Sequence, residues 1–454
     1  MTGSAPVSAS DRAQLAADTG ADFDPDTYRR GVPYAALARL RRRHGVVWVD
    51  EPAGLGWPAG PGFWLVLRHH DVEHVLRTPR EFSSWLGGTQ IRDPATPADL
   101  AYVRRMMLNM DPPEHSRLRR LLGRAFTARA VARLDRRIGD IAAVLADRVF
   151  GGSVEGEFDF AKDLAADLPL LTLAEVLGVP AQDRWLLFDW SNRVIGYQDP
   201  DYANSASFDP ASGSELAREA LRSRPAPGPD GRMPDPRTRA GMPDLYAYAH
   251  LLAESKRRSP GADVMSILLA EVDTDGGRVS VEEFENLFWL FAVAGNETLR
   301  NGLPGGMIAL LDHPAAQRTL RDRPALLPGA VEEMLRWWTP VMTFRRTATR
   351  NCTVAEVPVA AGDKVVVSFA AANRDDEVFA DADSFDVHRA PNPHLAFGHG
   401  PHFCLGAQLA RRQMQALFAE VLARTSEIRS AGEPTYLRSN FQRGVKRLPV
   451  HWHR

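Results

Sequence analysis

Apolar residues recur at helical spacing, every third or fourth position, over most of the chain. The longest such stretch, residues 281–311, would form a helix about 46 Å long at 1.5 Å per residue. Further helices are predicted at residues 33–43, 69–77, 128–150, 160–177, 182–195 and 244–258, and one near Asp111. Short apolar runs between glycines and prolines favour strands at residues 46–49, 63–67, 341–349 and 354–369. The pattern therefore predicts a mainly α-helical fold with small β-sheets.

The middle of the longest predicted helix departs from the apolar pattern. Ala294 and Gly295 are small, and Glu297 and Thr298 bring an acid and a hydroxyl into an apolar helix. Glycine inside a helix costs about 1 kcal/mol relative to alanine, so it favours a distorted helix or the close approach of a flat group. The structural alternative is a core acid tied to its neighbours, beside a hydroxyl that bonds back to a carbonyl.

Two long stretches and the first residues fall outside the regular pattern. Residues 83–108 are mixed, and residues 198–243 are rich in proline and glycine. Loops this long tend to be functional, so residues 198–243 are interpreted as an insertion that forms a lid, a partner contact or a flexible loop, with the flexible loop as the default. We predict that residues 224–239 are mobile. Residues 1–32 are polar and are expected to be a flexible leader, which leaves residues 33–454 as one large domain.

Composition narrows the class of protein. The chain has 454 residues, of which 55 are basic and 57 acidic, so it lacks the strong positive charge of a nucleic-acid-binding protein. Cys352 and Cys404 lie in unlike surroundings, which argues against a disulfide framework and favours a reducing, cytoplasmic location. We expect Cys352 to be inert. The first residues hold no apolar run that could anchor the chain in a membrane.

Residues 397–406 present one cysteine, Cys404, in a glycine-rich loop. Apolar residues at helical spacing over 405–417 predict that a helix begins at Cys404. This placement is expected to lower the pKa of the thiol and to suit a thiolate metal ligand. One alternative is a buried structural cysteine. The other is a zinc site formed with His399 and His402, although the spacing fits no common zinc pattern.

The loop closely resembles the haem-binding loop of the cytochrome P450 family, Phe-Gly-x-Gly-x-x-x-Cys-x-Gly. The matching residues are Phe397, Gly398, Gly400, Cys404 and Gly406. The resemblance implies haem b as the cofactor and Cys404 as the ligand of its iron. It also implies a single large triangular helical domain whose long central helix crosses over the haem.

Further blocks of the family follow in the expected order. His115 and Arg119, which are four residues apart and so share one helix face, resemble a propionate-binding pair. Arg346 resembles a second propionate-binding arginine, with Arg345 as the alternative. His402 resembles another propionate ligand. The weaker candidates are His394 and His399.

The centre of the long helix resembles the oxygen-binding groove of the same family. The resemblance implies that Ala294 and Gly295 lie against the haem, and that Glu297 and Thr298 are catalytic residues that deliver protons. It also implies a buried network that positions the cysteine loop and that we do not consider catalytic, formed by Glu333, Arg336 and Arg389.

The resemblance implies a haem-thiolate monooxygenase that inserts one oxygen atom from O2 into an apolar small molecule. Residues 107–115 and 292–301 are similar to actinobacterial members that hydroxylate sterols and branched lipids, so we expect hydroxylation of a steroid, terpenoid, lipid or other natural-product intermediate. The alternatives are a haem-thiolate peroxygenase or isomerase, and a haem protein that binds a gas without turnover. The substrate pocket is expected to be lined by Leu290, Val293, Ala294, Val341, Phe344 and Phe441.

Electrons are expected to come from other proteins. The 50 residues after Cys404 are too few for a flavin reductase domain. The resemblance implies a ferredoxin and its NAD(P)H-dependent reductase as partners of a monomeric enzyme. A basic docking face for the ferredoxin is expected from Arg117, Arg120, Arg124, Arg411 and Arg412.

Overall fold

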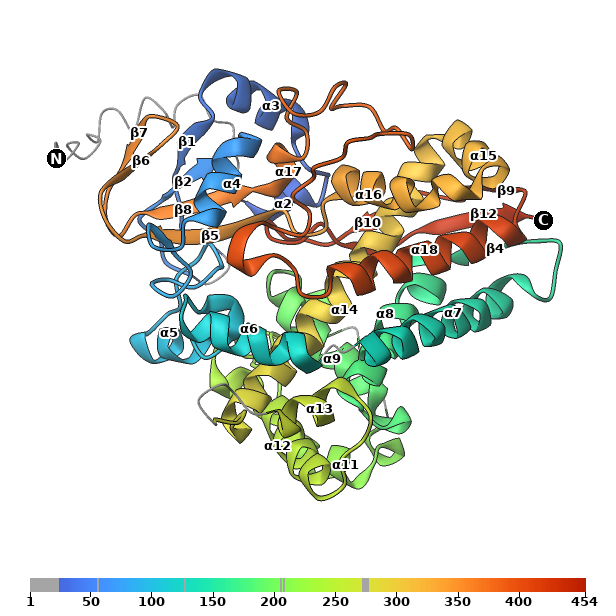
Figure 1. The fold of residues 1–454 in the computed structure, drawn as a ribbon, viewed down its shortest axis with the longest axis horizontal. Helices are drawn as coiled ribbons and strands as arrows, with labels where there is room; N and C mark the ends of the chain where they lie inside the picture. Colours follow the sequence, from blue (N-terminus) through green and yellow to red (C-terminus); the bar gives the residue numbers. More distant parts are fainter. Residues whose placement is uncertain (1–23, 55–56, 126–127, 205, 207–208, 272–276) are drawn as a thin grey trace.

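Residues 24–54, 57–125, 128–204, 206, 209–271 and 277–454 are described in the computed structural model of the protein. Helices make up most of the molecule and surround α14 (Val281–Asp312), which crosses its middle (Figure 1). A five-stranded sheet lies at one upper corner of a roughly triangular outline. This arrangement confirms the predicted fold class and the long central helix.

Helix α14 begins at a capping box and joins two hydrophobic cores. The Ser280 hydroxyl accepts a hydrogen bond from the backbone N–H of Glu283, whose carboxylate accepts one from the N–H of Ser280. Phe288 belongs to one core and Leu303 to the other, and both are fully buried. Residues 294–298 belong to neither core. The small and polar residues of the helix therefore lie at the junction between the two cores.

The other helices pack around α14 or against one another. Before it come α2 (Pro25–Tyr28), α3 (Tyr34–Arg43), α4 (His69–Arg77), α5 (Pro97–Val103), α6 (Glu114–Ala125), α7 (Ala128–Phe150), α8 (Asp167–Leu177), α9 (Arg184–Ile195), α10 (Pro200–Ala203), α11 (Glu215–Leu221), α12 (Pro243–Arg258) and α13 (Val264–Ala270). After it come α15 (Pro314–Asp322), α16 (Leu327–Trp338), α17 (Phe369–Ala372) and α18 (Ala407–Arg424). A π-helical turn at Phe160–Ala165 interrupts the helix predicted over residues 160–177. Within the described part of the chain, no helix combines the length and apolar character needed to cross a bilayer.

The largest sheet has the strand order β1-β2-β8-β5-β3, in which only β2 and β8 run parallel. Its strands are β1 (Val46–Val49), β2 (Phe63–Val66), β3 (Phe82–Ser83), β5 (Thr343–Ala348) and β8 (Lys364–Ser368). Smaller sheets pair β4 (Glu155–Asp159) and β9 (Glu427–Ser430) with β12 (Pro449–His453), β6 (Cys352–Val354) with β7 (Val357–Val359), and β10 (Thr435–Tyr436) with β11 (Val445–Arg447).

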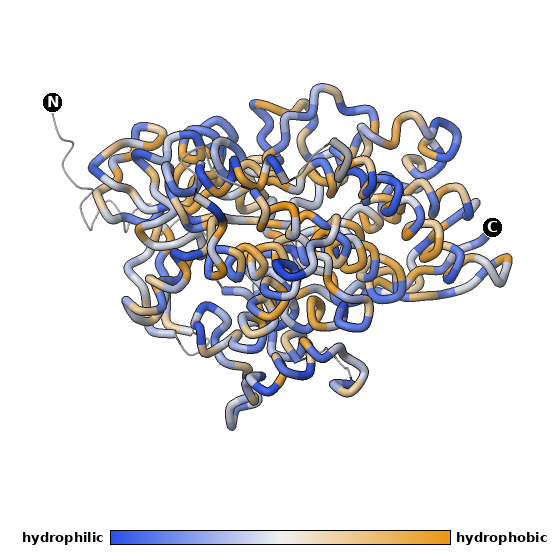
Figure 2. The backbone as a smooth tube through the Cα atoms, turned by 60° about the horizontal axis from the view of Figure 1, so that its bottom comes forward, coloured by the Kyte–Doolittle hydropathy of each residue, from blue (hydrophilic) through white to orange (hydrophobic). Residues whose placement is uncertain are grey.

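Alternation along the strands explains why apolar runs form the large sheet. In β2, Trp64 faces one hydrophobic core and Leu65 faces another, because successive side chains point to opposite faces. Both faces are covered, so the strand is apolar throughout. In the helices, hydrophobic and hydrophilic stretches alternate along the backbone instead (Figure 2), as amphipathic helices require.

Packing begins earlier in the chain than the predicted leader allows. Residues 1–23 of the leader lie outside the described residues. Asp26, in α2, forms an ion pair with Arg438 at 2.6 Å. The chain is therefore attached to the domain before residue 33, where the leader was expected to end.

The predicted insertion, residues 198–243, contains α10 and α11 and is attached at several points. Arg224 donates a 2.8 Å hydrogen bond to buried Asp189. Arg237 is 8% exposed and its guanidinium lies over the ring of Trp57. These contacts attach residues 224–239 to the domain near both ends, and their mobility stays a prediction. Local proline and glycine content could not reveal these contacts, because both partners lie far away in the sequence.

Candidate functional site

The cysteine loop, residues 397–406, is closed by a hydrogen bond from the N–H of Cys404 to the carbonyl of Phe397 at 2.9 Å. Gly398 and Gly400 have φ angles of 70° and 68°, a left-handed conformation that glycine adopts without strain. A Cβ on Gly400 would lie 2.4 Å from a backbone oxygen of α4. The expected backbone role of both glycines is confirmed.

Helix α18 begins later than predicted. It starts at Ala407 with Gly406 at its N-cap, so the expectation that it starts at Cys404 is wrong by three residues. Burial raises the pKa of the Cys404 thiol, although the Gly406 N–H and the cation of Arg119 act to lower it. On the free thiol, desolvation by the surrounding atoms outweighs the nearby positive charge although Cys404 is an exposed residue, and the lowering of the pKa expected for a metal ligand stays a prediction. Coordination to a metal would lower the pKa of the Cys404 thiol, since a metal ion deprotonates a coordinating thiol.

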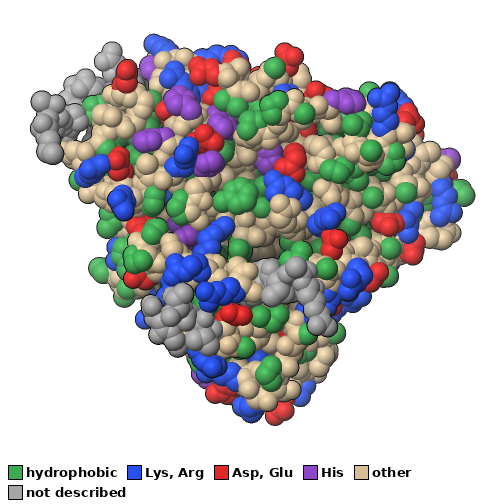
Figure 3. Space-filling model, viewed as in Figure 1, with side chains coloured by type: hydrophobic (Ala, Val, Ile, Leu, Met, Phe, Trp, Pro, Cys, Tyr) green, Lys and Arg blue, Asp and Glu red, His purple; other side chains and the backbone are tan. Residues whose placement is uncertain are grey.

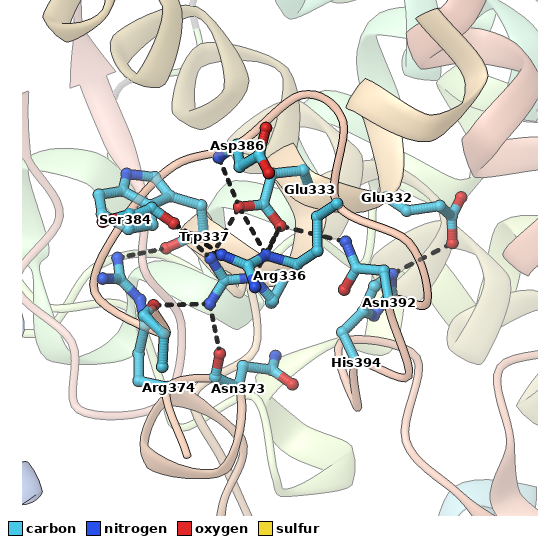
Figure 4. Close-up of polar contacts among 12 residues, drawn as sticks. Glu332, Glu333, Arg336, Trp337, Asn373, Arg374, Ser384, Asp386, Asn392 and His394 are labelled. Carbon is cyan, nitrogen blue, oxygen red and sulfur yellow. Dashed lines mark hydrogen bonds and ion pairs between the residues drawn. The ribbon is translucent and has the colours of Figure 1, made fainter. Parts of the chain in front are cut away.

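A buried network supports the cysteine loop from α16 (Figure 4). Glu333 and Arg336 form two hydrogen bonds of 2.7 Å and are fully buried. Arg389 donates to both Glu333 oxygens, at 3.2 and 3.1 Å. The predicted structural network is confirmed. Asn392 also donates to Glu333, at 3.1 Å, and this contact was not predicted.

The network continues into the cysteine loop through one asparagine. Arg336 donates to the backbone carbonyl of Asn373 at 2.8 Å. The Asn373 side chain accepts from the N–H of Leu395 at 2.7 Å, and the carbonyl of Leu395 accepts from the N–H of Gly398 at 2.9 Å. A continuous set of hydrogen bonds therefore places the start of the loop.

The weaker histidine candidates have other partners. His394 lies 3.1 Å from Glu332, which also accepts two hydrogen bonds from Arg411. Burial opposes ionisation of Glu332, but the hydrogen bonds from His394 and Arg411 lower its pKa to about 2. His399 lies 3.5 Å from Glu73. Neither histidine joins the group described next.

The zinc alternative at the cysteine loop has no support. The described residues contain no group of three or more His, Cys, Asp or Glu side chains that could hold a metal ion.

His115 and His402 come together although they are far apart in the sequence. Their ring centroids lie 4.0 Å apart. His115 is 1% exposed, and neither of its ring nitrogens has a partner within the described residues. Burial, with help from Arg119 and Arg346, lowers its pKa to about 4. Burial also lowers the pKa of His402. The two predicted residues therefore lie together: His115 is buried with both nitrogens unused, and His402 is half-buried, with its Nε2 3.4 Å from the Ser84 hydroxyl.

The two candidate arginines of β5 point to opposite faces of the strand, as adjacent strand residues do. Arg346 is 3% exposed, and burial lowers its pKa to about 10. Its recorded hydrogen bond goes to the Arg345 carbonyl at 2.8 Å, and among the described residues it makes no ion pair. Arg345 instead pairs with Asp93 at 2.5 Å. This geometry favours Arg346, which lies with the histidine cluster.

The residues around Cys404 fit a haem. Burial lowers the pKa of Arg119, which is close enough to Cys404 for their charges to interact. Arg119 and Arg346 are thus desolvated cations without a carboxylate partner in the described part of the chain, and His115 adds two unused nitrogens. A buried cation without an anion is costly. The two propionates of a haem ligated by Cys404 would supply the missing negative charge.

The centre of α14 contains exposed residues although most of the helix is buried. Ala294 and Gly295 are exposed and Thr298 is half-buried. The Thr298 hydroxyl donates to the Ala294 carbonyl at 2.9 Å. A Cβ on Gly295 would lie 3.0 Å from the Leu173 side chain, so close packing against α8 also explains this glycine. The exposed residues Ala294 and Gly295 mark where the predicted flat group would lie.

Glu297 faces away from this exposed surface. It is fully buried, and its carboxylate accepts hydrogen bonds from Tyr202 and Arg300, each at 2.9 Å. Glu297 and Thr298 therefore do not meet in one cavity. The bonds made by both side chains match the structural alternative, a core acid tied to neighbours beside a hydroxyl bonded to a carbonyl. Sequence reasoning missed Tyr202, which lies 95 positions from Glu297.

A cavity beside the exposed centre of α14 has the predicted lining. Thr298 reaches it, together with all six predicted pocket residues, namely Leu290, Val293, Ala294, Val341, Phe344 and Phe441. The predicted apolar pocket is confirmed.

The cavity also has polar lining residues that were not predicted. Tyr197 donates to Gln90 at 3.0 Å, and Arg237 lies over the Tyr197 ring. Gln90 and Arg237 come from the two stretches, residues 83–108 and 198–243, that were too long for ordinary connections, and Tyr197 lies immediately before the second stretch. That length was the signal that could have located them.

Comparison with known proteins agrees with this geometry. Residues 249–428 match the family model described as cytochrome P450. A steroid C26-monooxygenase of Rhodococcus jostii is 34% identical over 95% of this chain and 85% of its own length. A methyl-branched lipid omega-hydroxylase of Mycobacterium bovis is 37% identical over 92% of this chain and 90% of its own length. Both similarities cover nearly the whole chain.

A solved structure shares the fold. The Mycobacterium marinum cytochrome P450 in complex with pseudoionone superposes with a TM-score of 0.78 and 32% sequence identity. The match covers 94% of this chain and 97% of that one. The similarity therefore extends over nearly the whole of both chains.

The two arginines of β5 give a matched test of the haem-binding cluster. Arg346→Gln is expected to speed haem loss by about ten-fold or more, because it removes a charge-assisted bond to a propionate. Arg345→Gln removes an equal charge from the opposite face and should retain haem like the unmodified protein. Haem transfer to apomyoglobin measures both rates. Equal rates in the two variants, or faster loss from Arg345→Gln, would contradict the assignment.

Proposed function

Because the chain belongs to the cytochrome P450 family, and is thus a haem-dependent monooxygenase, we propose that it hydroxylates a bulky apolar molecule such as a steroid, terpenoid or branched lipid. The observation that carries this proposal is the cavity beside Thr298, which has the predicted apolar lining. The steroid and branched-lipid activities of its relatives support the same substrate class. A pocket of this kind binds its ligand mainly by removing apolar surface from water.

The residues around the cofactor would each have a defined task. When bound, haem supplies the activation of O2 and the transfer of one oxygen atom to the substrate. Cys404 would ligate the iron. Arg119 and Arg346 would bind the propionates by charge-assisted hydrogen bonds, and His115 and His402 would add further donors. We propose that Phe397, Gly398 and Gly406 shape the loop that presents the cysteine.

Thr298 is the proposed proton donor on the substrate side of α14. It is the polar residue of the exposed stretch of α14 that lines the cavity. Its hydroxyl donates to the Ala294 carbonyl, so its oxygen can accept a hydrogen bond from an ordered water, and rotation of the hydroxyl would free its hydrogen for delivery. Glu297, on the opposite side of the helix, would support the supply of protons rather than touch the substrate. In a water-excluded pocket such positioned groups must replace bulk water.

We propose that electrons reach the haem from a ferredoxin and its reductase, with the enzyme acting as a cytoplasmic monomer. Lys and Arg side chains gather over α6 (Figure 3). Several predicted docking residues already have acidic partners: Arg117 pairs with Glu283, and Arg412 pairs with Asp135 at 3.2 Å. Acidic side chains therefore already neutralise part of the expected basic face. Arg120, which is exposed on α6, is the strongest candidate in this face for contact with the ferredoxin.

The cysteine assignment has a built-in control. Cys404→Ser is expected to abolish the thiolate-type absorption of the reduced carbon monoxide complex, because an alcohol replaces the soft sulfur ligand. Cys352→Ser, at a half-buried position in β6, should leave the spectrum unchanged. A spectrum that survives Cys404→Ser would overturn the assignment.

The substrate class can be tested by binding alone. Steroids, terpenoids and methyl-branched fatty acids are expected to shift the spin state of the resting haem more strongly than small aromatic ethers do. Val293→Phe should weaken the response to the tightest ligand by about ten-fold or more, because it fills part of the cavity without changing the haem site. The proposal fails if small aromatics bind best, or if Val293→Phe leaves the affinity unchanged.

Thr298→Ala tests the proton donor. We expect normal haem content and substrate binding, but a loss of product per NADH of about ten-fold or more, with the electrons appearing as hydrogen peroxide. Thr319→Ala is the control, because the Thr319 hydroxyl makes the same bond four residues back, to Ala315 at 3.0 Å, in α15. Full coupling of NADH to product in Thr298→Ala would show that another group delivers the protons.

A further inference from the structure

The carboxylate of Glu297 has two partners of different origin. One oxygen accepts from Arg300, one turn further along α14, at 2.9 Å. The other accepts from the hydroxyl of Tyr202, also at 2.9 Å. Tyr202 belongs to α10, within residues 198–243, which form part of the cover of the substrate cavity. Glu297 on the central helix is thus held in part by residues 198–243, called the covering segment below.

Tyr202 is held firmly in this position. It is 5% exposed, and its backbone N–H donates to the side chain of Asp199, the N-cap of α10. Asp199 forms an ion pair with Lys446 at 2.9 Å, which attaches α10 to β11. Burial raises the pKa of Tyr202 well above its usual value, so the phenol remains protonated and can donate at neutral pH.

Arg300 connects the Glu297 carboxylate to α9. Its guanidinium donates to the side chain of Asn192 at 2.6 Å and lies 4.2 Å from the centre of the Phe188 ring. The Tyr202 ring lies 5.0 Å away from the same guanidinium. Removing only the hydroxyl of Tyr202 would leave this ring contact in place. The hydrogen bond to Glu297 can therefore be deleted with little change in packing.

The covering segment also reaches the cavity. Arg237, near the end of the segment, lines it, and so does Tyr197, which immediately precedes the segment. Arg237 lies over both the Tyr197 ring and the Trp57 ring, at 5.7 and 5.0 Å. Five positions separate the cavity-lining Tyr197 from Tyr202. One short stretch of chain therefore contacts both the cavity, through Tyr197, and Glu297, through Tyr202.

We propose that Tyr202 is a positioning residue for the oxygenation reaction, which sets the orientation of Glu297 and makes the proton supply depend on the placement of the segment that covers the substrate. This inference rests on the proposed role of Glu297. It assigns a role in the reaction to a residue of the predicted insertion. Without the Tyr202 hydroxyl, one carboxylate oxygen loses its donor in a buried setting, and the carboxylate is free to turn.

The hydrogen bond itself can be tested without turnover. If Tyr202 depends on Glu297, Glu297→Gln should speed backbone hydrogen exchange at residues 202–204 by about ten-fold, because a bond to a charged partner is replaced by a weaker one. Exchange in α12 should stay unchanged, since its Tyr248 donates instead to Asp183 at 2.8 Å. Unchanged exchange at residues 202–204 would overturn the proposed dependence.

The role in the reaction needs a double-mutant comparison. Tyr202→Phe is expected to lower product per NADH by about ten-fold and to increase the solvent deuterium effect on NADH consumption, with haem content and substrate affinity unchanged. The variant carrying both Tyr202→Phe and Glu297→Gln should match Glu297→Gln alone, because Tyr202 acts through the carboxylate. Tyr248→Phe, which removes another buried hydroxyl from a carboxylate, should behave like the unmodified enzyme.

The possible outcomes distinguish the positioning role of Tyr202 from the proposed role of Glu297 in proton supply. Additive losses in the double variant, or full coupling in Tyr202→Phe, would overturn the positioning role of Tyr202. If Glu297→Gln is fully coupled but still speeds exchange at residues 202–204, the hydrogen bond is real and the proposed role of Glu297 is wrong instead. A merely structural Tyr202 would change stability and leave the solvent deuterium effect unmoved.

Discussion

The position of the cysteine loop depends on one buried carboxylate, that of Glu333. Removing a charge from water is costly, so both of its oxygens must be satisfied. They accept from Arg336, from Arg389 and from the N–H of Asp386. The remaining donors of Arg336 bind backbone carbonyls of the chain that leads to the loop (Figure 4). Loss of this carboxylate would leave two buried cations without an anion and would release the segment that carries Cys404.

The central helix has a different constraint, because it must pass through two cores while leaving its middle open. Phe288 and Leu303 place its two halves in separate hydrophobic cores. Between them, Ala294 and Gly295 remain exposed, and Glu297 turns its charge to the opposite side. The packing at both ends supplies the burial that stabilises the helix. The middle can therefore keep small residues that help stability little but leave room for a cofactor.

The parts of this structure that a local pattern encodes could be predicted from the sequence. The bounds of α14 follow from its periodicity, and the loop geometry follows from Gly398 and Gly400. The start of α18 was misplaced because Cys404 precedes an N-cap that no side chain marks. The partners of Glu297 and Arg237 were missed because rings and hydroxyls far away in the sequence carry no local signal of contact. Composition likewise gave no sign of the tertiary contacts that residues 224–239 make.

Charge is distributed unequally between the side of the haem site near Cys404 and the side beyond α14. This difference determines which ligands each side can bind. Near Cys404, Arg119 and Arg346 are desolvated cations without carboxylate partners among the described residues. On the far side of α14, Glu297 is paired with Arg300. An anionic cofactor edge is therefore attracted to the first side only. The cavity between them is lined largely by apolar side chains, so an apolar substrate can bind there beside Thr298, while the charged pair of Glu297 and Arg300 lies outside the lining.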